Sequence, residues 1–494
     1  MALAVLSLCA WMTHFGMADA AEPDKGLGVN LHGVSYWSPT QPFVDVFRQS
    51  GAWVPQREGS QVWDTREPLD IDEHGWLRSL TPGQQAATVV MSGGTYPVGT
   101  YTVTYDGQGD LSFNMDARIA GRHGNDLLVE VQPKYRVIMK VLRTDPRDPI
   151  RNVRMYMPGF DPSRHQVTFN PRYLGYLKGF KVVRFVDWAK ANTNNDIKWS
   201  DRTRPMHASQ DRNNGVALEY MIQMAESMDA NPWFTVPHAA SDDYVIEMAK
   251  LIKRQLKLGR KFYLEYSNEV WNGIFPQHAY ASREASRLGL RDADDYYVRR
   301  TLQVFKLFEG VFGGSRQFVR VLSGQAVNTW RAKRLLDYPD IGKQVDAYAI
   351  APYFGHEIAE AVRGKGSHSV AVEAVMGKLE SSVEGIRKIV SANMAIAKQA
   401  GVQLIAYEAG QHVTNPPGDD DFCAAINRHP AMGRLYEKYL DIWQQETAGA
   451  LMVMYADVSR YDRNGCWGLS EQIGQDAKMA PKLVAVRAHL QAGK

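Results

Sequence analysis

The sequence Lys261-Phe-Tyr-Leu-Glu-Tyr-Ser-Asn-Glu-Val-Trp-Asn-Gly273 joins an aromatic, alternating run to an abruptly polar ending. The alternation over its first half predicts a β-strand that stops at Asn268 and Glu269. A second stretch, Val402-Gln-Leu-Ile-Ala-Tyr-Glu408, is also an apolar run that ends in a carboxylate. Active sites of β/α barrels lie at the carboxyl ends of the strands, so these two glutamates are the first candidates for chemistry.

Six more apolar runs of similar length are spaced evenly along the chain. Amphipathic helical patterns alternate with them, as in 217–227, 244–258, 370–400 and 430–445. Eight short strands alternating with helices predict an α/β fold, a (β/α)8 TIM barrel, rather than an open doubly wound sheet. The six other predicted strands are residues 27–36, 181–188, 231–238, 318–323, 345–353 and 450–455.

The pattern changes between the first and second of these strands. Thr100-Tyr-Thr-Val-Thr-Tyr105 alternates with a period of two, and Asp106-Gly107 after it is a hairpin signal. No convincing helix interrupts this region, which predicts an inserted all-β, sandwich-like domain. The predicted domains are a barrel start (22–55), the insertion (56–159) and the remainder of the barrel (160–494). The insertion either binds glycan or forms one wall of a cleft.

Composition narrows the possible functions. The formal net charge is +3 and no Lys/Arg block stands out, so we expect no nucleic-acid partner. Aromatic residues make up 11% of the chain, and carbohydrate-binding clefts use such rings as stacking platforms. No apolar run approaches the ~20 residues of a membrane span. The sequence gives no oligomeric state.

The N-terminus carries an export signal or a buried segment. An apolar stretch that begins at Met1 is followed by Ala18-Asp19-Ala20-Ala21, a small-x-small pattern typical of signal peptides, so residues 1–21 predict export to the periplasm or the extracellular space. Cleavage would remove Cys9 and leave Cys423 and Cys466. These two form either one disulfide or two buried free thiols.

The residues that finish the eight predicted strands form a ring of carboxylate, amide, imidazole and aromatic groups. The ring lacks the closely spaced His and carboxylate ligands of a metal site, so we expect neither metal nor cofactor. Its members are Trp37, Arg184, Asp187, Trp188, His238, Asn268, Glu269, Ser323, Gln325, Tyr353, Glu408 and Tyr455.

The chain resembles clan A of the glycoside hydrolases, the retaining (β/α)8 group. The resemblance rests on Asn268-Glu269 closing the fourth strand, Tyr353 closing the sixth and Glu408 closing the seventh. It covers roughly residues 27–55 and 160–490. The extended form Tyr-Ser-Asn-Glu-Val-Trp-Asn resembles a cellulase-like subgroup.

The resemblance implies a catalytic role for each of four residues. Glu269 would be the general acid/base and Glu408 the nucleophile. Tyr353 would orient Glu408, and Arg184 would lie beneath it and keep it ionised. Glu269 then needs a raised pKa, which the neighbouring negative charge would supply. Glu265 lies on the same strand face and competes as the acid, although its deeper position favours a buried hydrogen-bonded role.

The remaining candidates would bind sugar. The resemblance gives Asn268 a hydrogen bond to the sugar 2-hydroxyl and gives His238 a place in the glycone subsite, where a structural hydrogen bond is the alternative. Ala351 departs from the clan, some of whose members have a histidine there, and His356 is a candidate to replace it. Four rim tryptophans are candidate stacking platforms, with core packing as the alternative: Trp37, Trp188, Trp271 and Trp467.

Together these features predict an exported retaining β-glycoside hydrolase that cleaves a polysaccharide by double displacement. Endo cleavage by a β-glucanase or cellulase-like enzyme is the favoured form, because rim aromatics suit an open cleft. The alternative from another class is a non-catalytic glycan-binding or exopolysaccharide-scaffold protein on a barrel fold.

Overall fold

The computed structural model describes residues 21–123, 126–160, 167–358 and 372–493. The predicted signal peptide therefore lies outside the described residues except for Ala21, and so does Cys9. Within the described ranges no helix is both long and apolar enough to cross a bilayer.

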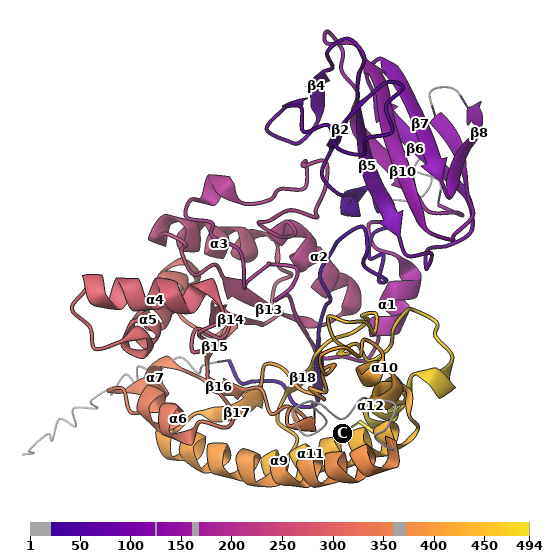
Figure 1. Cartoon of the computed structure of the whole chain (residues 1–494). Helices are drawn as coiled ribbons and strands as arrows, with labels where there is room; N and C mark the ends of the chain where they lie inside the picture. The colour runs from indigo at the N-terminus through magenta and orange to yellow at the C-terminus, as the bar shows by residue number, and fades with distance from the viewer. Residues whose placement is uncertain (1–20, 124–125, 161–166, 359–371, 494) are drawn as a thin grey trace, which may run out of the picture.

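Eight parallel strands close into a barrel, as the spacing of apolar runs predicted (Figure 1). Each strand pairs with the next in sequence, and the last pairs with the first, so that Gly28 lies between Val182 and Val453. A Cβ at Gly28 would come within 2.8 Å of the Val182 carbonyl oxygen, which explains the glycine there. The strands are β1 (Leu27–Asn30), β12 (Val182–Arg184), β13 (Asn231–Val236), β14 (Phe262–Tyr266), β15 (Phe318–Ser323), β16 (Ala347–Ile350), β17 (Gln403–Ala406) and β18 (Met452–Met454).

Helices surround the barrel and bury their apolar faces against the outward side chains of the strands. Helix α3 (Asp242–Gln255) begins where the Ser241 hydroxyl accepts a hydrogen bond from the amide of Tyr244, and α5 (Ala293–Phe312) begins at the analogous cap Asp292. The other helices are α1 (Pro171–Leu177), α2 (Leu218–Met228), α4 (Pro276–Arg287), α6 (Thr329–Leu336), α7 (Ile341–Gln344), α9 (Val372–Ala400), α10 (Phe422–Arg428), α11 (Ala431–Thr447) and α12 (Pro481–Gln491).

The predicted insertion is an antiparallel sandwich that follows β1 (Figure 1). One sheet has the order β2 (Val54–Arg57), β5 (Gln84–Ser92), β10 (Arg136–Thr144), β7 (Gly109–Met115). The other has the order β11 (Arg151–Tyr156), β6 (Gly99–Asp106), β9 (Asp126–Val131), β8 (Ala117–His123), and a small hairpin joins β3 (Asp70–Ile71) to β4 (Leu77–Ser79).

Local chemistry explains the pairing of these strands. Gly107, which turns the chain between β6 and β7, has a φ of +91°, and a Cβ there would meet the Pro149 carbonyl oxygen at 2.2 Å. Alternate residues of the two sheets, such as Tyr101, Val129 and Met139, are fully buried between them.

The sandwich is fastened to the barrel beside the first strand. Asp45 accepts a hydrogen bond of 2.9 Å from the amide of Met155 and forms ion pairs of 3.3 Å with Arg48 and Arg154. The Tyr36 ring packs on the face of the first sheet, and the Tyr36 carbonyl accepts a hydrogen bond of 2.8 Å from the amide of Ser92. The loop after β1 is thus held between the two domains.

Candidate active site

Glu408 lies immediately beyond β17 and is held through both carboxylate oxygens. Arg184, on β12, donates from Nη1 to Oε1 at 2.9 Å, and the Tyr353 hydroxyl donates to Oε2 at 3.0 Å. Arg184 is fully buried, and Glu408 is 8% exposed. The three residues that the sequence grouped around a nucleophile are therefore in direct contact. A cation below and a hydroxyl beside the carboxylate favour its ionised form.

Glu269 lies beyond the end of β14 and receives only neutral donors. The Tyr407 hydroxyl donates to Oε1 at 2.8 Å, and Nδ2 of Asn272 donates to Oε2 at 3.0 Å. The backbone here is unusual, with φ values of +60° at Ser267 and +41° at Glu269. Left-handed conformations of such residues cost on the order of 1–3 kcal/mol and persist only where the surroundings enforce them.

Asn268 supplies that enforcement. Its carbonyl oxygen accepts from Nε2 of Gln277 at 2.7 Å, and its Oδ1 accepts from Nη2 of Arg184 at 2.7 Å. Its side-chain nitrogen Nδ2 donates to Oδ1 of Asn192 at 3.0 Å. Because an amide nitrogen carries two hydrogens, one side-chain N–H of Asn268 has no hydrogen bond among the described residues.

Glu265, the competing acid, is fully buried in β14 and saturated with donors. Its Oε2 accepts from Nη2 of Arg184 at 2.8 Å and from the Trp233 indole at 2.9 Å, and its Oε1 accepts from the Ser323 hydroxyl at 2.7 Å. A carboxylate with these partners holds Arg184 in place and has no path to a leaving group. This geometry favours the structural alternative for Glu265.

Burial raises the pKa of both Glu269 and Glu408. For Glu408 the charge of Arg184 and the Tyr353 hydroxyl oppose that rise, whereas at Glu269 the main opposing groups are the neutral donors Asn272 and Tyr407. Two close carboxyls resist double ionisation, so the pair holds one proton over part of the pH range. The cation at Glu408 favours that proton on Glu269.

A hollow of about 340 Å³ opens at the carboxyl ends of β1, β12 and β18. On its wall the Tyr455 hydroxyl donates to Oδ2 of Asp187 at 3.3 Å, and burial raises the pKa of Asp187 to about 6. A row of aromatic rings connects this hollow to Glu408, which Tyr353 contacts. The ring centroids of Tyr353 and His412 are 5.3 Å apart, and those of His412 and Trp467 are 5.7 Å apart. His412 is thus the histidine whose ring packs on Tyr353, and the role suggested for His356 stays a prediction. The main lining side chains are His32, Trp37, Asp187, Lys190, Asn192, Tyr455 and Trp467.

The four candidate tryptophans separate into different environments. Trp37 is 49% exposed and lines the hollow with the half-buried Trp467. Trp271 is half-buried near Glu269, and its carbonyl accepts a hydrogen bond from Arg331. The prediction for Trp188 is wrong. Its side chain is fully buried against Phe43, Phe169 and Phe185, and its indole donates to the His32 carbonyl.

His238 is 3% exposed and packs against the Tyr280 ring at 5.1 Å. Burial, with a smaller effect from Arg283, lowers the pKa of His238 to about 4, so its ring is neutral. Among the described residues no hydrogen bond joins it to either glutamate. Nδ1 of His238 is buried without a hydrogen-bond partner among the described residues, so no structural hydrogen bond is formed there, and a place in the glycone subsite stays a prediction.

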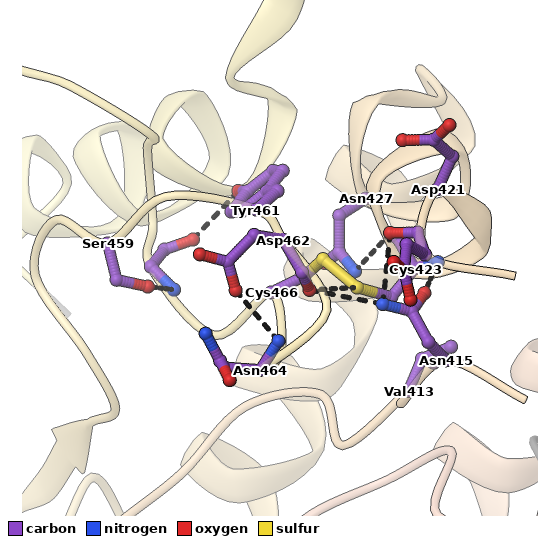
Figure 2. Close-up of a disulfide and its surroundings, with 12 residues drawn as sticks. Val413, Asn415, Asp421, Cys423, Asn427, Ser459, Tyr461, Asp462, Asn464 and Cys466 are labelled. Carbon is purple, nitrogen blue, oxygen red and sulfur yellow. Dashed lines mark hydrogen bonds between the residues drawn. A yellow bond between two sulfur atoms is a disulfide. The ribbon is translucent and has the colours of Figure 1, made fainter. Parts of the chain in front are cut away.

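A disulfide shapes the loop that carries Trp467 (Figure 2). Cys423, in α10, and Cys466 are bonded, with their Cα atoms 6.0 Å apart, which decides between the two alternatives left by the sequence. The Cys466 carbonyl accepts hydrogen bonds from Nε2 of Gln411 at 2.8 Å and from Nζ of the buried Lys482 at 2.7 Å. Trp467 is thus anchored by the residue directly before it.

Sequence reasoning missed several side chains that contact the candidates. Tyr407 belongs to an apolar strand pattern in the sequence. Nothing in that pattern shows that its hydroxyl contacts Glu269, which lies at the end of another strand. Asn272 carried a weak signal, since it follows Glu269 in the short polar turn. The other missed residues come from loops whose paths have no periodic pattern: Asn192, Lys190 and His412. In the part of the chain that the structure covers, no three His, Cys, Asp or Glu side chains are grouped to hold a metal ion.

No protein-family model matches the sequence, and no curated protein matches it. Solved structures resemble part of the chain. The GH51 arabinofuranosidase from Xanthomonas axonopodis pv. citri has a TM-score of 0.42 and 12% identity, over 61% of this chain and 62% of that enzyme. The family 51 α-L-arabinofuranosidase from Bifidobacterium longum gives 0.43 and 14%, over 66% and 68%. Xylanase 10B from Thermotoga maritima gives 0.36 and 11%, over 65% and 89%.

The chain thus spans less than two thirds of the length of the first of these enzymes. At such identities the likeness concerns the barrel alone, and the activity has to be argued from the residues of this chain.

Proposed function

We propose that this protein is a retaining β-glycoside hydrolase that cleaves a polysaccharide. The observation that carries the proposal is the pair of strand-end glutamates with unequal surroundings. Glu408 faces the cation Arg184 and the Tyr353 hydroxyl, whereas Glu269 faces the neutral donors Tyr407 and Asn272. A nucleophile and an acid need this difference in protonation, and a pair of structural polar caps does not.

In the first step Glu408, kept ionised by Arg184, attacks the anomeric carbon. Glu269 gives its proton to the leaving oxygen, and a glycosyl ester forms on Glu408. Esterification removes the negative charge of Glu408, so the pKa of Glu269 falls. Glu269 then accepts a proton from the attacking water, and the ester is cleaved with retention of configuration. In this proposal the second N–H of Asn268 binds the sugar 2-hydroxyl during both steps, the role that the resemblance implies.

Endo cleavage, in the manner of a β-glucanase or cellulase, is part of the proposal. The hollow beside the glutamates carries an exposed tryptophan, Trp37, and a second ring, Trp467, which suits an extended chain. Export is also proposed. The N-terminal signal pattern supports it, and so does the Cys423–Cys466 disulfide, because such bonds persist in oxidising compartments.

The first experiment is release of reducing ends from a panel of β-glucans, mannans, xylans and bacterial exopolysaccharides. Wild type is compared with Glu269→Gln and Glu408→Gln, with folding checked by circular dichroism. We expect one polysaccharide to be cut and both folded variants to lose several orders of magnitude of activity. If folded wild type binds a polysaccharide and never cuts one, the glycan-binding or scaffold alternative replaces the hydrolase.

A second experiment separates the two roles. Azide and an activated aryl glycoside are supplied to Glu269→Ala and Glu408→Ala. An acid/base variant still forms the glycosyl ester, so azide should restore turnover of Glu269→Ala and give a glycosyl azide of retained configuration. Azide can take the place of a lost nucleophile only with inversion, so Glu408→Ala should give the opposite anomer. The reverse pattern would exchange the two assignments.

A further inference from the structure

A second hollow of about 340 Å³ lies where the sandwich meets the barrel. Trp53, which directly precedes β2, and Ile71 of the insertion line it on one side, and residues 211–213 of the loop before α2 line it on the barrel side. Figure 1 shows the sandwich standing over this side of the barrel, near α1 and α2. We call this cavity the junction hollow.

The junction hollow adjoins the hollow beside the glutamates. Lys190 lines the active-site hollow, and its Nζ lies 3.8 Å from Oδ1 of Asp211, which lines the junction hollow. The backbone amide of Tyr36 also favours the ionised form of Asp211, and the next residue, Trp37, lines the active-site hollow. A chain that leaves the glutamates past Trp37 is therefore directed toward the junction.

Arg212 is the unexplained group in the junction hollow. Its Nε is buried without a partner, and within the described ranges its guanidinium forms no hydrogen bond or ion pair. Arg184 and Arg320, which are more deeply buried, are by contrast paired with carboxylates. Burial lowers the pKa of Arg212, with Asp196 acting in the opposite direction from beyond ion-pair distance. A half-buried cation without a counter-ion is costly unless a ligand supplies the anion.

Nearby carboxylates do not meet this need. Asp211 shares the hollow, but its charge is directed to Lys190 and the Tyr36 amide. Asp196 accepts a hydrogen bond from the Asn214 side chain at Oδ1, its Oδ2 is buried without a partner among the described residues, and it forms no ion pair with Arg212 there. Trp53, whose indole nitrogen donates to the Gly75 carbonyl at 2.9 Å, is half-buried and leaves part of its ring toward the hollow.

We infer that the junction hollow is a distal subsite for a carboxylate-bearing sugar, a uronate unit of the polysaccharide, bound by Arg212 and stacked on Trp53. The planar guanidinium fork matches a carboxylate through two parallel hydrogen bonds, and a tryptophan ring matches the apolar face of a pyranose. The inference rests on the proposed function, since it places the unit on the chain that the glutamates cleave.

The test measures binding and not cleavage. The Glu269→Gln protein is run by affinity electrophoresis in gels that contain glucuronoxylan, polygalacturonate or alginate, each beside its carboxyl-reduced form. We expect one acidic polymer to be bound at least tenfold more tightly than its reduced form. Adding Arg212→Gln should abolish the difference, and Arg212→Lys should keep part of it. Arg254→Gln, an exposed arginine on α3, is the matched control and should change nothing.

Stability gives a second readout. Because the Arg212 guanidinium forms no hydrogen bond or ion pair with the described residues, Arg212→Gln should leave Tm unchanged or slightly raised. Equal retention of acidic and reduced polymers, retention that is unchanged in Arg212→Gln, or a fall of several degrees in Tm would each overturn the inference. Its failure is separable from that of the proposed function. If a neutral polysaccharide is cleaved and Arg212→Gln has no effect, only the subsite is contradicted. If binding depends on Arg212 and no cleavage occurs, only the hydrolase is contradicted.

Discussion

The hydroxyl of Tyr407 donates a hydrogen bond of 2.8 Å to Oε1 of Glu269, although the two residues stand at the ends of different strands, β17 and β14. Tyr407 is fully buried and directly precedes Glu408, and the Arg184 guanidinium lies 5.0 Å from the centre of its ring. One chain segment thus contacts both proposed catalytic carboxyls. Any shift of this segment would change the protonation of one and the position of the other.

The first prediction concerns this hydrogen bond. Glu269 must be protonated to act as the acid, so activity falls as pH rises through its pKa, which burial has already raised. The Tyr407 hydroxyl stabilises the ionised form. Its removal in Tyr407→Phe should therefore raise that pKa further and move the alkaline limb of kcat/KM up by about one pH unit.

Tyr348→Phe is the matched control, because the buried Tyr348 hydroxyl on β16 has no hydrogen-bond partner among the residues that the structure describes. Its alkaline limb should coincide with that of wild type. An unshifted profile in Tyr407→Phe, or the same shift in both variants, would exclude a positioning role for Tyr407.

The second prediction separates Glu265 from Glu269. Glu265→Gln removes the charge that faces Arg184 at 2.8 Å in the barrel interior, and breaking a buried pair of this kind costs about 3 kcal/mol of unfolding free energy. Urea denaturation should show that loss, while activity falls far less than in Glu269→Gln. Glu247→Gln, whose partner Lys250 is exposed, should match wild type in both measurements. A stable Glu265→Gln protein that is inactive and rescued by azide would make Glu265 the acid.

The sequence predicted the barrel because eight apolar runs of strand length recur between helical patterns, and this periodicity depends only on local burial. It also placed Asn268, Glu269 and Glu408 at strand ends, where a parallel barrel brings them to one face. Arg184 and Tyr353 were assigned around Glu408 by resemblance, and their contacts of 2.9 and 3.0 Å agree with that grouping.

The remainder depended on packing between distant segments. Trp188 follows a strand just as Trp37 does, yet the chain after β12 turns inward and the chain after β1 is held out by the sandwich, so identical sequence signals end at 0% and 49% exposure. The contact between Tyr407 and Glu269 and the unpaired state of Arg212 likewise arise from loop paths that no local pattern encodes.

The third prediction uses that contrast. Trp37→Ala removes a half-exposed ring from the wall of the active-site hollow, so KM for polysaccharide should rise about tenfold with little change in Tm. Trp188→Ala empties a filled core site and should cost about 3–5 kcal/mol in urea denaturation. Equal KM values for wild type and Trp37→Ala would remove Trp37 from the substrate site.

The last prediction concerns the Cys423–Cys466 disulfide. The bond closes a loop with a sequence separation of 43. In the chain-entropy account, the lost conformational entropy raises the free energy of the unfolded state by about 4 kcal/mol. Reduction with dithiothreitol, or the Cys423→Ser/Cys466→Ser double variant, should therefore lower Tm by several degrees.

Trp467 follows Cys466 directly, and the Cys466 carbonyl remains bonded to Gln411 and Lys482 without the disulfide. Those two bonds should hold Trp467 in place in the folded state, so KM should change little at temperatures well below Tm. A large rise in KM with an unchanged Tm would instead mean that the disulfide positions Trp467 and adds nothing to global stability. Measuring Tm and KM on the same reduced sample separates these outcomes. The control sample is not reduced, and any free thiols in it are blocked with iodoacetamide.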